Sequence, residues 1–451
     1  MPQISIIKKS NIQEARRFDA EFFKPEYLEI ERKIINHQWD YLRDISEDIL
    51  TGKTPQYEKD AKTLVVRSGD LRKNLIDIDG LLKTNETDLF YLNKNDVLIS
   101  SIGKGSIGKI AINYEKEKIV TVSEVTVIRN AKITSAFLNM FLLSYFGQAQ
   151  IEKFITGATG QLHLLPSNIK KFKIPILPQS FQLQIEKIVK YAYQKQTKSK
   201  QLYKEAEKTL LKELDLLDYK PKHILSFQTT KKETDEARRF DAEYFQPKYD
   251  EIIKKIEKYK NGWNYVKNIV HWKKGVEVGS ETYRQSGMSF GRVSDFSING
   301  VEKTGKKISK ELYQELKKDY QPKQNDILFT KDGTIGLSYV IKEEFEVILS
   351  GAFLRLSLKD KYQSFEKECL SLIFNSIICK MQVEKLSGGA IIAHLKPSDF
   401  EKFKIPLIKP QIQKQIAKKI QESHKLRKKS KELLEEAKRR VEEKIEMVEN
   451  N

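Results

Sequence analysis

The residues of this chain that could do chemistry are lysines set among glycines. The segment GKGSIGKI at 103–110 nearly matches the phosphate-binding pattern G-x-x-x-x-G-K-[ST]. Its last position is Ile110, so the hydroxyl that would hold Mg²⁺ is missing, and IGKIAINY predicts a strand where that motif must open a helix. A similar segment at 333–340, GTIGLSYV, contains no lysine. We therefore interpret 103–110 as a tight glycine hairpin, with a nucleotide-hydrolysing enzyme as the alternative.

Other signatures of catalysis or metal binding are missing from the sequence. There is no Asp/Asn-Pro-Pro-aromatic motif and no glycine-rich loop that would hold S-adenosylmethionine. The two cysteines, Cys369 and Cys379, both lie in the second half of the chain, and the six histidines are scattered. This pattern favours neither a disulfide framework nor a metal site. We expect a protein that is not an enzyme and carries no catalytic residue, metal or cofactor of its own.

The charge of the chain indicates its binding partner. Its 81 Lys and Arg residues exceed its 62 Asp and Glu residues, which gives a net charge of +19 and a pI of about 9.4. Such an excess favours a polyanion, with nucleic acid first; a lysine-rich proteome is the alternative. No apolar run of 18 residues and no apolar signal core occurs. We expect a soluble, cytoplasmic protein with no membrane partner.

The chain repeats itself. EARRFDAEFFKPEYLEI at 14–30 and EARRFDAEYFQPKYDEI at 236–252 match at 13 of 17 positions. A second pair, HLLPSNIKKFKIPI and HLKPSDFEKFKIPL, begins at His163 and His394. The offsets are 236 − 14 = 222 and 394 − 163 = 231, so about nine residues are inserted between the two echoes. This period is too long for a solenoid, and it predicts two like domains related by a pseudo-two-fold axis.

Each half has the same expected order of elements. A short helix carrying the first echo, at about 19–35 and 241–258, contains a proline that marks a kink or a late start. Apolar helices are expected around 135–156 and 365–386. Strand-like runs rich in β-branched and aromatic residues lie between these helices; they cover 63–68, 96–100, 109–114, 119–128, 326–330, 336–341 and 345–358.

Each half ends in a long amphipathic stretch, 179–217 and 410–449, with no glycine or proline after its first residue. Apolar residues recur there at spacings of three and four, which predicts two helices of coiled-coil character. The simplest way to bury both stripes is an antiparallel pair; packing of each helix on its own domain is the alternative. The expected interface residues are Ile185, Val189, Leu202, Leu210, Leu214, Ile416, Ile420, Leu433, Val441 and Ile445.

The predicted fold class is therefore α+β, with two tandem α/β target-recognition domains joined by two long helices that form an antiparallel coiled coil. The expected segments are domain 1 (1–178), helix 1 (179–217), a linker (218–235), domain 2 (236–409) and helix 2 (410–449). A basic protein of this kind suits DNA, with a half-site for each domain and a gap set by the helices. Arginine suits guanine and lysine suits phosphate. The candidate DNA contacts are Lys53, Arg67, Arg72, Lys73, Lys104 and Lys109 in the first half, and Lys273, Lys274, Arg284, Arg292 and Lys331 in the second.

These features resemble the specificity (S) subunit of type I restriction–modification systems. FKIPILPQSFQLQI at 172–185 and FKIPLIKPQIQKQI at 403–416 are similar to the passage from the family's variable region into its long helix. TGKTP at 51–55 looks like the opening of a recognition domain, and DVLISSIGKGSIG with DILFTKDGTIG is similar to a recurrent family motif. The second half lacks a clear TGKTP, and Lys409 replaces a proline.

The resemblance implies a non-catalytic subunit that reads an asymmetric bipartite site in double-stranded DNA. It also implies that two methyltransferase subunits dock on the helices and domains and use S-adenosylmethionine. Restriction subunits that use ATP and Mg²⁺ are further possible partners. The alternatives are a specificity subunit of another restriction class and a stand-alone DNA-binding regulator.

Overall fold

The computed structural model describes residues 4–15, 17–103, 105–157, 162–301, 304–387 and 394–447. Contacts divide the chain into two compact units, of which unit 1 comprises Met1–Thr197 with Arg427–Asn451 and unit 2 comprises Lys198–Leu426. The final part of the last helix thus packs with the first half of the sequence, because its apolar stripe is buried there. Over the described residues, no helix is long and apolar enough to cross a membrane.

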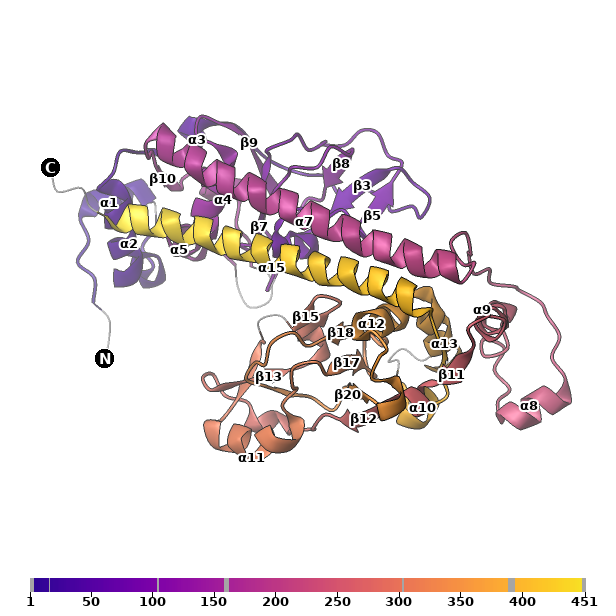
Figure 1. The fold of residues 1–451 in the computed structure, drawn as a ribbon. Coiled ribbons are helices and arrows are strands. Elements are labelled where there is room, and N and C mark those ends of the chain that lie inside the picture. Colours follow the sequence, from indigo (N-terminus) through magenta and orange to yellow (C-terminus); the bar gives the residue numbers. More distant parts are fainter. Residues whose placement is uncertain are drawn as a thin grey trace. The chain divides into compact units, whose positions relative to one another are not determined.

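Unit 1 is built on mixed sheets covered by short helices (Figure 1). Its five-stranded sheet has the order β2-β9-β6-β7-β4, a three-stranded sheet has the order β5-β3-β8, and β1 pairs with β10. The strands are β1 (Trp39–Tyr41), β2 (Ser46–Thr51), β3 (Thr63–Val66), β4 (Asn74–Leu75), β5 (Leu82–Thr84), β6 (Val97–Ser100), β7 (Ile110–Ile112), β8 (Ile119–Thr121), β9 (Val125–Ala131) and β10 (Lys173–Pro175). The helices before the long one are α1 (Lys9–Ala15), η1 (Ala20–Phe23), α2 (Pro25–Ile35), α3 (Leu42–Ile45), η2 (Ser68–Lys73), α4 (Ser135–Leu143), α5 (Tyr145–Phe154) and α6 (Pro166–Ile169).

Unit 2 repeats this topology. Its sheets have the orders β12-β20-β17-β18 and β16-β13-β19, and the pairs β11-β21 and β14-β15 complete it. The strands are β11 (Trp263–Tyr265), β12 (Val270–Lys274), β13 (Met288–Gly291), β14 (Phe296–Ser297), β15 (Gly300–Val301), β16 (Lys306–Ile308), β17 (Ile327–Thr330), β18 (Ser338–Val340), β19 (Val347–Leu349), β20 (Phe353–Leu358) and β21 (Lys404–Pro406). The helices are α8 (Lys231–Ala237), α9 (Pro247–Glu257), α10 (Val266–Ile269), η3 (Ser280–Thr282), η4 (Val293–Asp295), α11 (Lys310–Tyr320), η5 (Asp360–Tyr362), α12 (Lys367–Asn375), α13 (Ile377–Ser387) and α14 (Pro397–Phe400). Helix α11 stands where unit 1 has the loop 85–96.

Some predicted helices have different bounds. The first echo does not form one helix from residue 19 or 241, because α2 and α9 begin at Pro25 and Pro247. Proline is favoured at this first helical position, since its missing N–H needs no partner there. The helix expected at 135–156 is interrupted at Ser144, whose hydroxyl accepts a hydrogen bond from the N–H of Gly147 and so starts α5. The helix expected at 365–386 is interrupted in the same way at Ser376.

The long helices are α7 (Gln179–Glu213) and α15 (Pro410–Glu446), and Figure 1 draws each as one continuous ribbon. Helix α7 ends before the predicted residue 217 because Asp215 has a φ of 53° and the N–H of Leu216 turns back to the carbonyl of Leu211. Residues 448 and 449 of the predicted second helix lie outside the described residues.

The two long helices pack on each other inside each unit. In unit 1 the buried Ser430 hydroxyl donates to the carbonyl of Ala192 at 2.7 Å. In unit 2 the buried Ser199 hydroxyl donates to the carbonyl of Ser423 at 2.7 Å, and the Ser423 hydroxyl donates to the carbonyl of Ser199 at 2.8 Å. Adding 231 converts 192 into 423 and 199 into 430. The two contacts are therefore equivalent in the repeat.

Candidate nucleic-acid interface

The ends of three strands meet at one edge of unit 1. β3 and β8 are parallel, with Val66 opposite Thr121, so the residues that follow them emerge side by side. The end of β2 is held there because the N–H of Lys53 donates to the carbonyl of Thr121 at 3.1 Å. A Cβ on Gly52 would stand 2.2 Å from that carbonyl oxygen, so glycine alone permits this approach. We call this place, formed by 51–54, 66–68 and 121–124, the unit 1 edge.

Unit 2 contains the equivalent place. β13 and β19 are parallel, with Gly291 opposite Leu349, and the N–H of Val276 donates to the carbonyl of Leu349 at 3.0 Å. A Cβ on Gly275 would stand 2.1 Å from the carbonyl oxygen of Ser350. We call 274–277, 291–293 and 349–352 the unit 2 edge. Gly275 therefore occupies the same place in unit 2 as Gly52 of the TGKTP segment in unit 1. The two sequences around these glycines are only faintly similar.

Both edges carry an arginine that an aspartate orients. The backbone N–H of Arg67 donates to the Asp70 carboxylate at 2.9 Å, and the guanidinium Nε lies 3.3 Å from the same oxygen. In unit 2 the N–H of Arg292 donates to Asp295 at 3.1 Å, but the guanidinium Nε lies 3.6 Å from that carboxylate and is buried without a hydrogen-bond partner. Both side chains are partly exposed. A guanidinium has five N–H donors, so one carboxylate leaves donors for a further acceptor.

The remaining groups of the unit 1 edge are polar. Lys53 is exposed, and its Nζ lies 3.2 Å from the Asp88 carboxylate. The hydroxyls of Thr54 and Ser123 are hydrogen-bonded at 2.9 Å. Neither hydroxyl was predicted from the sequence, where the available signal was the serine between two strand-like runs in IVTVSEVTVI. An ammonium, a guanidinium and two hydroxyls at one edge can bond to phosphates or to base edges.

The glycine hairpin lies beside this edge. The N–H of Ser101 donates to the carbonyl of Glu124 at 2.8 Å, and the N–H of Gly108 donates to the carbonyl of Ser100 at 2.9 Å. The chain then enters strand β7, so the hairpin lacks the helix that a phosphate-binding P-loop requires. Lys109 is half-buried at the end of the hairpin. Lys104 lies outside the described residues.

The equivalent hairpin of unit 2 carries a buried ion pair. The N–H of Lys331 donates to the carbonyl of Ala352 at 2.8 Å, which places it where Ser101 lies in unit 1. Its side chain is buried, with Nζ 2.5 Å from the Asp332 carboxylate, and that carboxylate also contacts the ring of His394. Lys331 is therefore not an exposed donor, whereas Lys273, Lys274 and Arg284 are exposed.

The other candidates lie around the edges. Lys273 and Lys274 are exposed at the end of β12, where they pair with Arg355 and Leu354 of β20. Arg284 is exposed, and its guanidinium donates to the carbonyls of Glu281 at 2.7 Å and Tyr283 at 3.0 Å. Arg72 and Lys73 belong to η2, but their side chains lie outside the described part. The structure thus gathers Lys53 with Arg67, and Lys274 with Arg292.

An ion pair joins two strands of the five-stranded sheet at the end that lies away from the unit 1 edge. The Arg129 guanidinium donates to both oxygens of Asp96, at 3.0 and 2.7 Å, and to the carbonyl of Tyr91 at 2.8 Å. The hydrogen bonds to Asp96 raise the pKa of Arg129. Because the pair is mostly buried, it fixes the start of β6 against β9.

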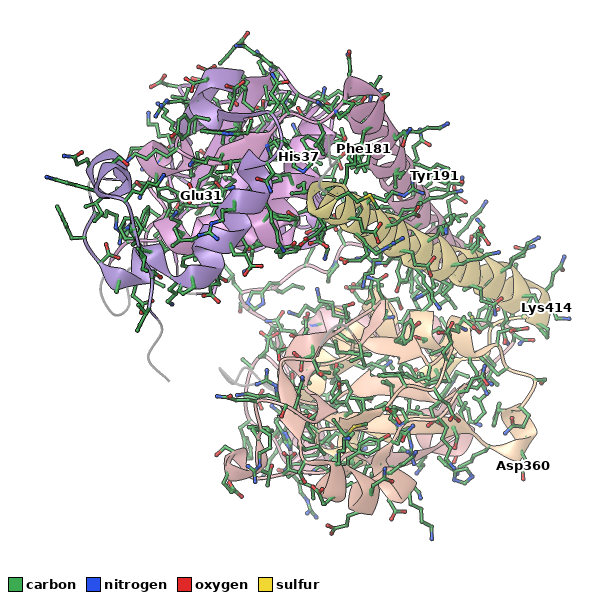
Figure 2. The ribbon with its side chains drawn as sticks, turned by 90° about the vertical axis from the view of Figure 1, so that its left-hand side faces the viewer. Glu31, His37, Phe181, Tyr191, Asp360 and Lys414 are labelled. Carbon is green, nitrogen blue, oxygen red and sulfur yellow. The ribbon has the colours of Figure 1, made fainter. Side chains whose placement is uncertain are left out.

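The residues expected at the helix pair lie in two cores. Ile185, Val189, Leu433, Val441 and Ile445 are buried in the core of unit 1. Leu210, Leu214, Ile416 and Ile420 are buried in the core of unit 2. Leu202 is half-buried. Near the end of α15, the ring of His37 lies 2.9 Å from the carbonyl of Ile445, and Figure 2 labels this histidine.

Comparison with known proteins accounts for the duplicated architecture. The family described as the type I restriction modification DNA specificity domain matches residues 40–208 and 292–438. The chain belongs to this family. The first match extends into α7 and the second into α15, so each match runs along a long helix from one unit into the other.

Individual relatives extend along most of the chain. A putative type I restriction enzyme specificity subunit from Methanocaldococcus jannaschii is 26% identical over 447 residues, which cover 93% of this chain and 96% of the relative. The S subunit of a type I system from M. genitalium is 14% identical, with a TM-score of 0.43 and coverage of 92% and 96%. An HsdS subunit from Thermoanaerobacter tengcongensis is 13% identical, with a TM-score of 0.30 and coverage of 91% and 97%.

Proposed function

We propose that this chain is the DNA-recognition subunit of a type I restriction–modification complex and that its two edges read two different half-sites. The observation that supports the proposal is that the two edges share one backbone arrangement but carry different exposed side chains. Both edges have the close-approach glycine and the aspartate-held arginine. Lys53 of unit 1 is replaced by Val276 in unit 2. A shared frame with different side chains suits an asymmetric bipartite target.

The arginines and lysines would have different roles at these edges. The Arg67 guanidinium is hydrogen-bonded to Asp70, whereas that of Arg292 lies near Asp295 without a hydrogen bond. Either guanidinium can bond bidentately to a guanine or to a phosphate. Lys53, Lys273 and Lys274 are exposed ammonium groups that suit phosphates. Lys331 is left out of the proposed contact surface because its side chain is buried against Asp332.

The partner subunits are proposed from membership of the family. Two methyltransferase subunits would join the chain and methylate the site with S-adenosylmethionine, and restriction subunits that use ATP and Mg²⁺ would join that complex. The chain itself would contribute recognition and no catalytic group. It would act in the cytoplasm, and the long helices would set the gap between the half-sites.

Exchange of one sheet region tests the proposal. Residues 46–131 run from β2 to β9 and include the whole unit 1 edge, while they leave β1, β10 and α7 in place. Replacing them with the matching region of a relative, and mapping methylated DNA by long-read sequencing, should change one half-site and preserve the other. The matched exchange of 270–358 should change only the other half-site. A change in both half-sites after either exchange would contradict the assignment of one half-site to each unit.

A further inference from the structure

Each edge carries one glutamate among its basic side chains. Within the ranges that define the edges, the charged residues are Lys53, Arg67 and Glu124 in unit 1, and Lys274, Arg292 and Glu277 in unit 2. The two arginines occupy equivalent positions after the parallel strands, whereas the lysines and the glutamates do not. Both edges therefore keep the same three kinds of charged group, although the chain supplies two of them from different positions.

The two glutamates follow different strands. Glu124 follows β8, and Ala352 occupies its position in unit 2, because both carbonyls accept the same hydrogen bond from the neighbouring hairpin at 2.8 Å. Glu277 comes two residues after the close-approach glycine of unit 2, where unit 1 has Thr54. Neither glutamate has an acidic counterpart at the equivalent position of the other unit, so the duplication alone does not explain why both edges have one.

The two carboxylates nevertheless lie beside the same position of the frame. Oε2 of Glu124 lies 3.4 Å from the Ser123 hydroxyl and 3.4 Å from the Thr54 hydroxyl. Gly351 is the equivalent of Ser123 in unit 2, and a Cβ added to it would stand 2.0 Å from Oε1 of Glu277. Gly351 has no positive φ, so what this glycine provides is room for the carboxylate. The two edges thus bring a carboxylate to one place from two different strands.

The cations of the edges do not neutralise these carboxylates. In unit 1 the edge lysine pairs with Asp88 and the edge arginine with Asp70. Over the part of the chain that the structure describes, no ion pair joins a cation to Glu124 or to Glu277. Glu277 is exposed and Glu124 is half-buried, so both carboxylates can reach a bound molecule.

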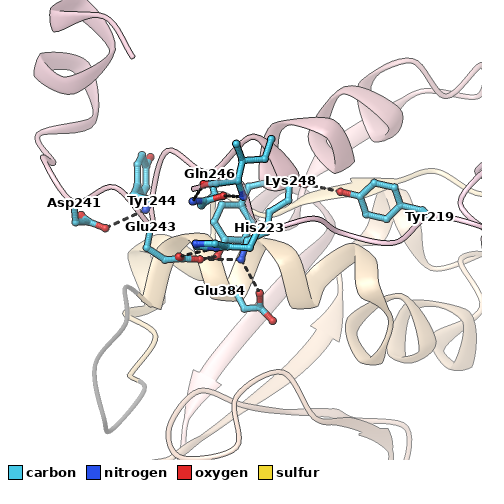
Figure 3. Close-up of polar contacts among 10 residues, drawn as sticks. Tyr219, His223, Asp241, Glu243, Tyr244, Gln246, Lys248 and Glu384 are labelled. Atoms are coloured by element: carbon cyan, nitrogen blue, oxygen red, sulfur yellow. Dashed lines mark hydrogen bonds and ion pairs between the residues drawn. The ribbon is translucent and has the colours of Figure 1, made fainter. Parts of the chain in front are cut away.

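Glutamates elsewhere in unit 2 are held by cations. The Lys248 ammonium lies 2.9 Å from the Glu243 carboxylate and 4.0 Å from that of Glu384, and Figure 3 shows this group. The glutamates of the edges differ, because they keep an uncompensated charge and unused acceptor capacity on the surface that we assign to DNA.

A carboxylate on a DNA-binding surface is repelled by the phosphates, so it lowers affinity unless it gains a specific partner. A carboxylate can only accept hydrogen bonds. In the major groove, the N4 amino group of cytosine is a donor that carboxylates bind. Adenine also has an amino group there, but the adjacent N7 is an acceptor and would face the carboxylate. Cytosine is therefore the base that fits a lone carboxylate best.

We propose that Glu124 and Glu277 are specificity-determining residues, each of which accepts a hydrogen bond from the N4 amino group of one cytosine in the half-site that its unit reads. This inference rests on the proposed function, which places the two edges against DNA. It adds the identity of the base that is read at one position of each half-site. The basic side chains attract the duplex, and the glutamates restrict which sequences fit.

The test uses the complex that the full chain forms with the methyltransferase subunit of its own system. Long-read methylation mapping gives the target, and competition binding to duplexes in which each base pair is replaced in turn gives the discrimination at every position. Glu124→Gln should lower the preference for cytosine about tenfold at one position of one half-site. Glu277→Gln should do the same in the other half-site alone. Adenine should gain at both positions, because glutamine bonds to its N6 and N7.

Glu47→Gln is the matched control in unit 1. Glu47 lies at the start of β2 (Ser46–Thr51), at the end away from the unit 1 edge, and its carboxylate accepts a hydrogen bond from Asn130 at 2.6 Å. This variant should leave the discrimination unchanged at every position. Thermal melting of the Glu277→Gln chain should also be unchanged, because that side chain is exposed.

Four outcomes would overturn the inference. If both edge variants keep the base preferences of the unchanged complex, the glutamates do not read bases while the proposed function stands. If they bind every duplex more tightly by one common factor, the carboxylates only repel phosphates. If the position that changes holds a base pair without cytosine, the assignment of the base is wrong. If the unchanged complex binds all duplexes alike, the proposed function and this inference fail together.

Discussion

Replacement of Glu31 by glutamine should lower the free energy of unfolding of unit 1, because it removes the negative charge of one partly buried side chain. Glu31 lies on α2, labelled in Figure 2, and its carboxylate contacts Lys153 at 2.7 Å and also Lys173. The three side chains are 26%, 9% and 19% exposed. Burial favours the neutral carboxyl, but the two ammonium groups outweigh it and hold the pKa of Glu31 below its usual 4.5.

The magnitude follows from this burial. Removal of one partner from a fully buried pair costs about 3–5 kcal/mol, because an uncompensated charge stays behind. Here water reaches part of the cluster, so we expect a loss of about 2 kcal/mol in the free energy of unfolding. Glutamine keeps the volume and one oxygen acceptor, so the loss reports the charge and not a cavity.

Unit 2 provides the matched control. Lys404 lies 4.9 Å from the Trp263 ring, as Lys173 lies 4.9 Å from the Trp39 ring, but Lys404 pairs with the more exposed Glu257. Glu257→Gln should therefore cost about 0.5 kcal/mol or less. Urea unfolding followed by tryptophan fluorescence, with hydrogen exchange of α2 and α9, measures both variants.

The pH dependence gives a second check. Because the pKa of Glu31 is lowered on folding, its contribution is complete above about 4.5 and is lost as the pH falls through the lower folded value. The stability difference between Glu31→Gln and the unchanged chain should shrink below that pH. Equal costs for the Glu31 and Glu257 variants, or a difference that persists in acid, would refute the reasoning.

Three other changes test the edges and the helix pair. Arg67→Ala should weaken binding to the target duplex about tenfold in fluorescence anisotropy, whereas Arg43→Ala, at the opposite end of β2, should leave it unchanged; equal effects would remove Arg67 from the interface. Gly52→Ala would place its Cβ 2.2 Å from a backbone oxygen, so unit 1 should lose about 1–3 kcal/mol and DNA binding should fall; an unaltered melting curve would contradict the close approach. Ser430→Ala and Ser199→Ala should each cost about 1 kcal/mol in urea unfolding, because each removes a buried hydrogen bond of 2.7 Å; a loss for only one of them would contradict their equivalence.

Much of the fold could be predicted from local patterns. The strand-like runs became β3, β6, β7, β8 and β9, because β-branched and glycine-bounded runs favour strands wherever they are buried. The long apolar stripes became α7 and α15. The bounds were less accurate where one side chain decides them, as at Ser144, whose hydroxyl starts a new helix inside an apolar run.

The candidate edges could be predicted only in part. Lys53 and Arg67 were singled out by their type, but the contacts that gather them join residues more than fifty positions apart, such as Lys53 with Thr121. Arg67 and Arg292 share the spacing Arg-x-x-Asp in the sequence, but only the structure shows that each aspartate accepts the backbone N–H of its arginine. Lys331 was predicted as a surface contact because nothing in its local sequence indicates burial.

The sequence by itself determined the duplication, the order of elements and the two long helices, since repeats and periodicity are local properties of the chain. Only the tertiary structure decided which strand ends meet, which cations are exposed and which glutamates pair with cations. These outcomes depend on pairing between distant segments and on the burial that results, and neither is encoded in the spacing of neighbouring residues.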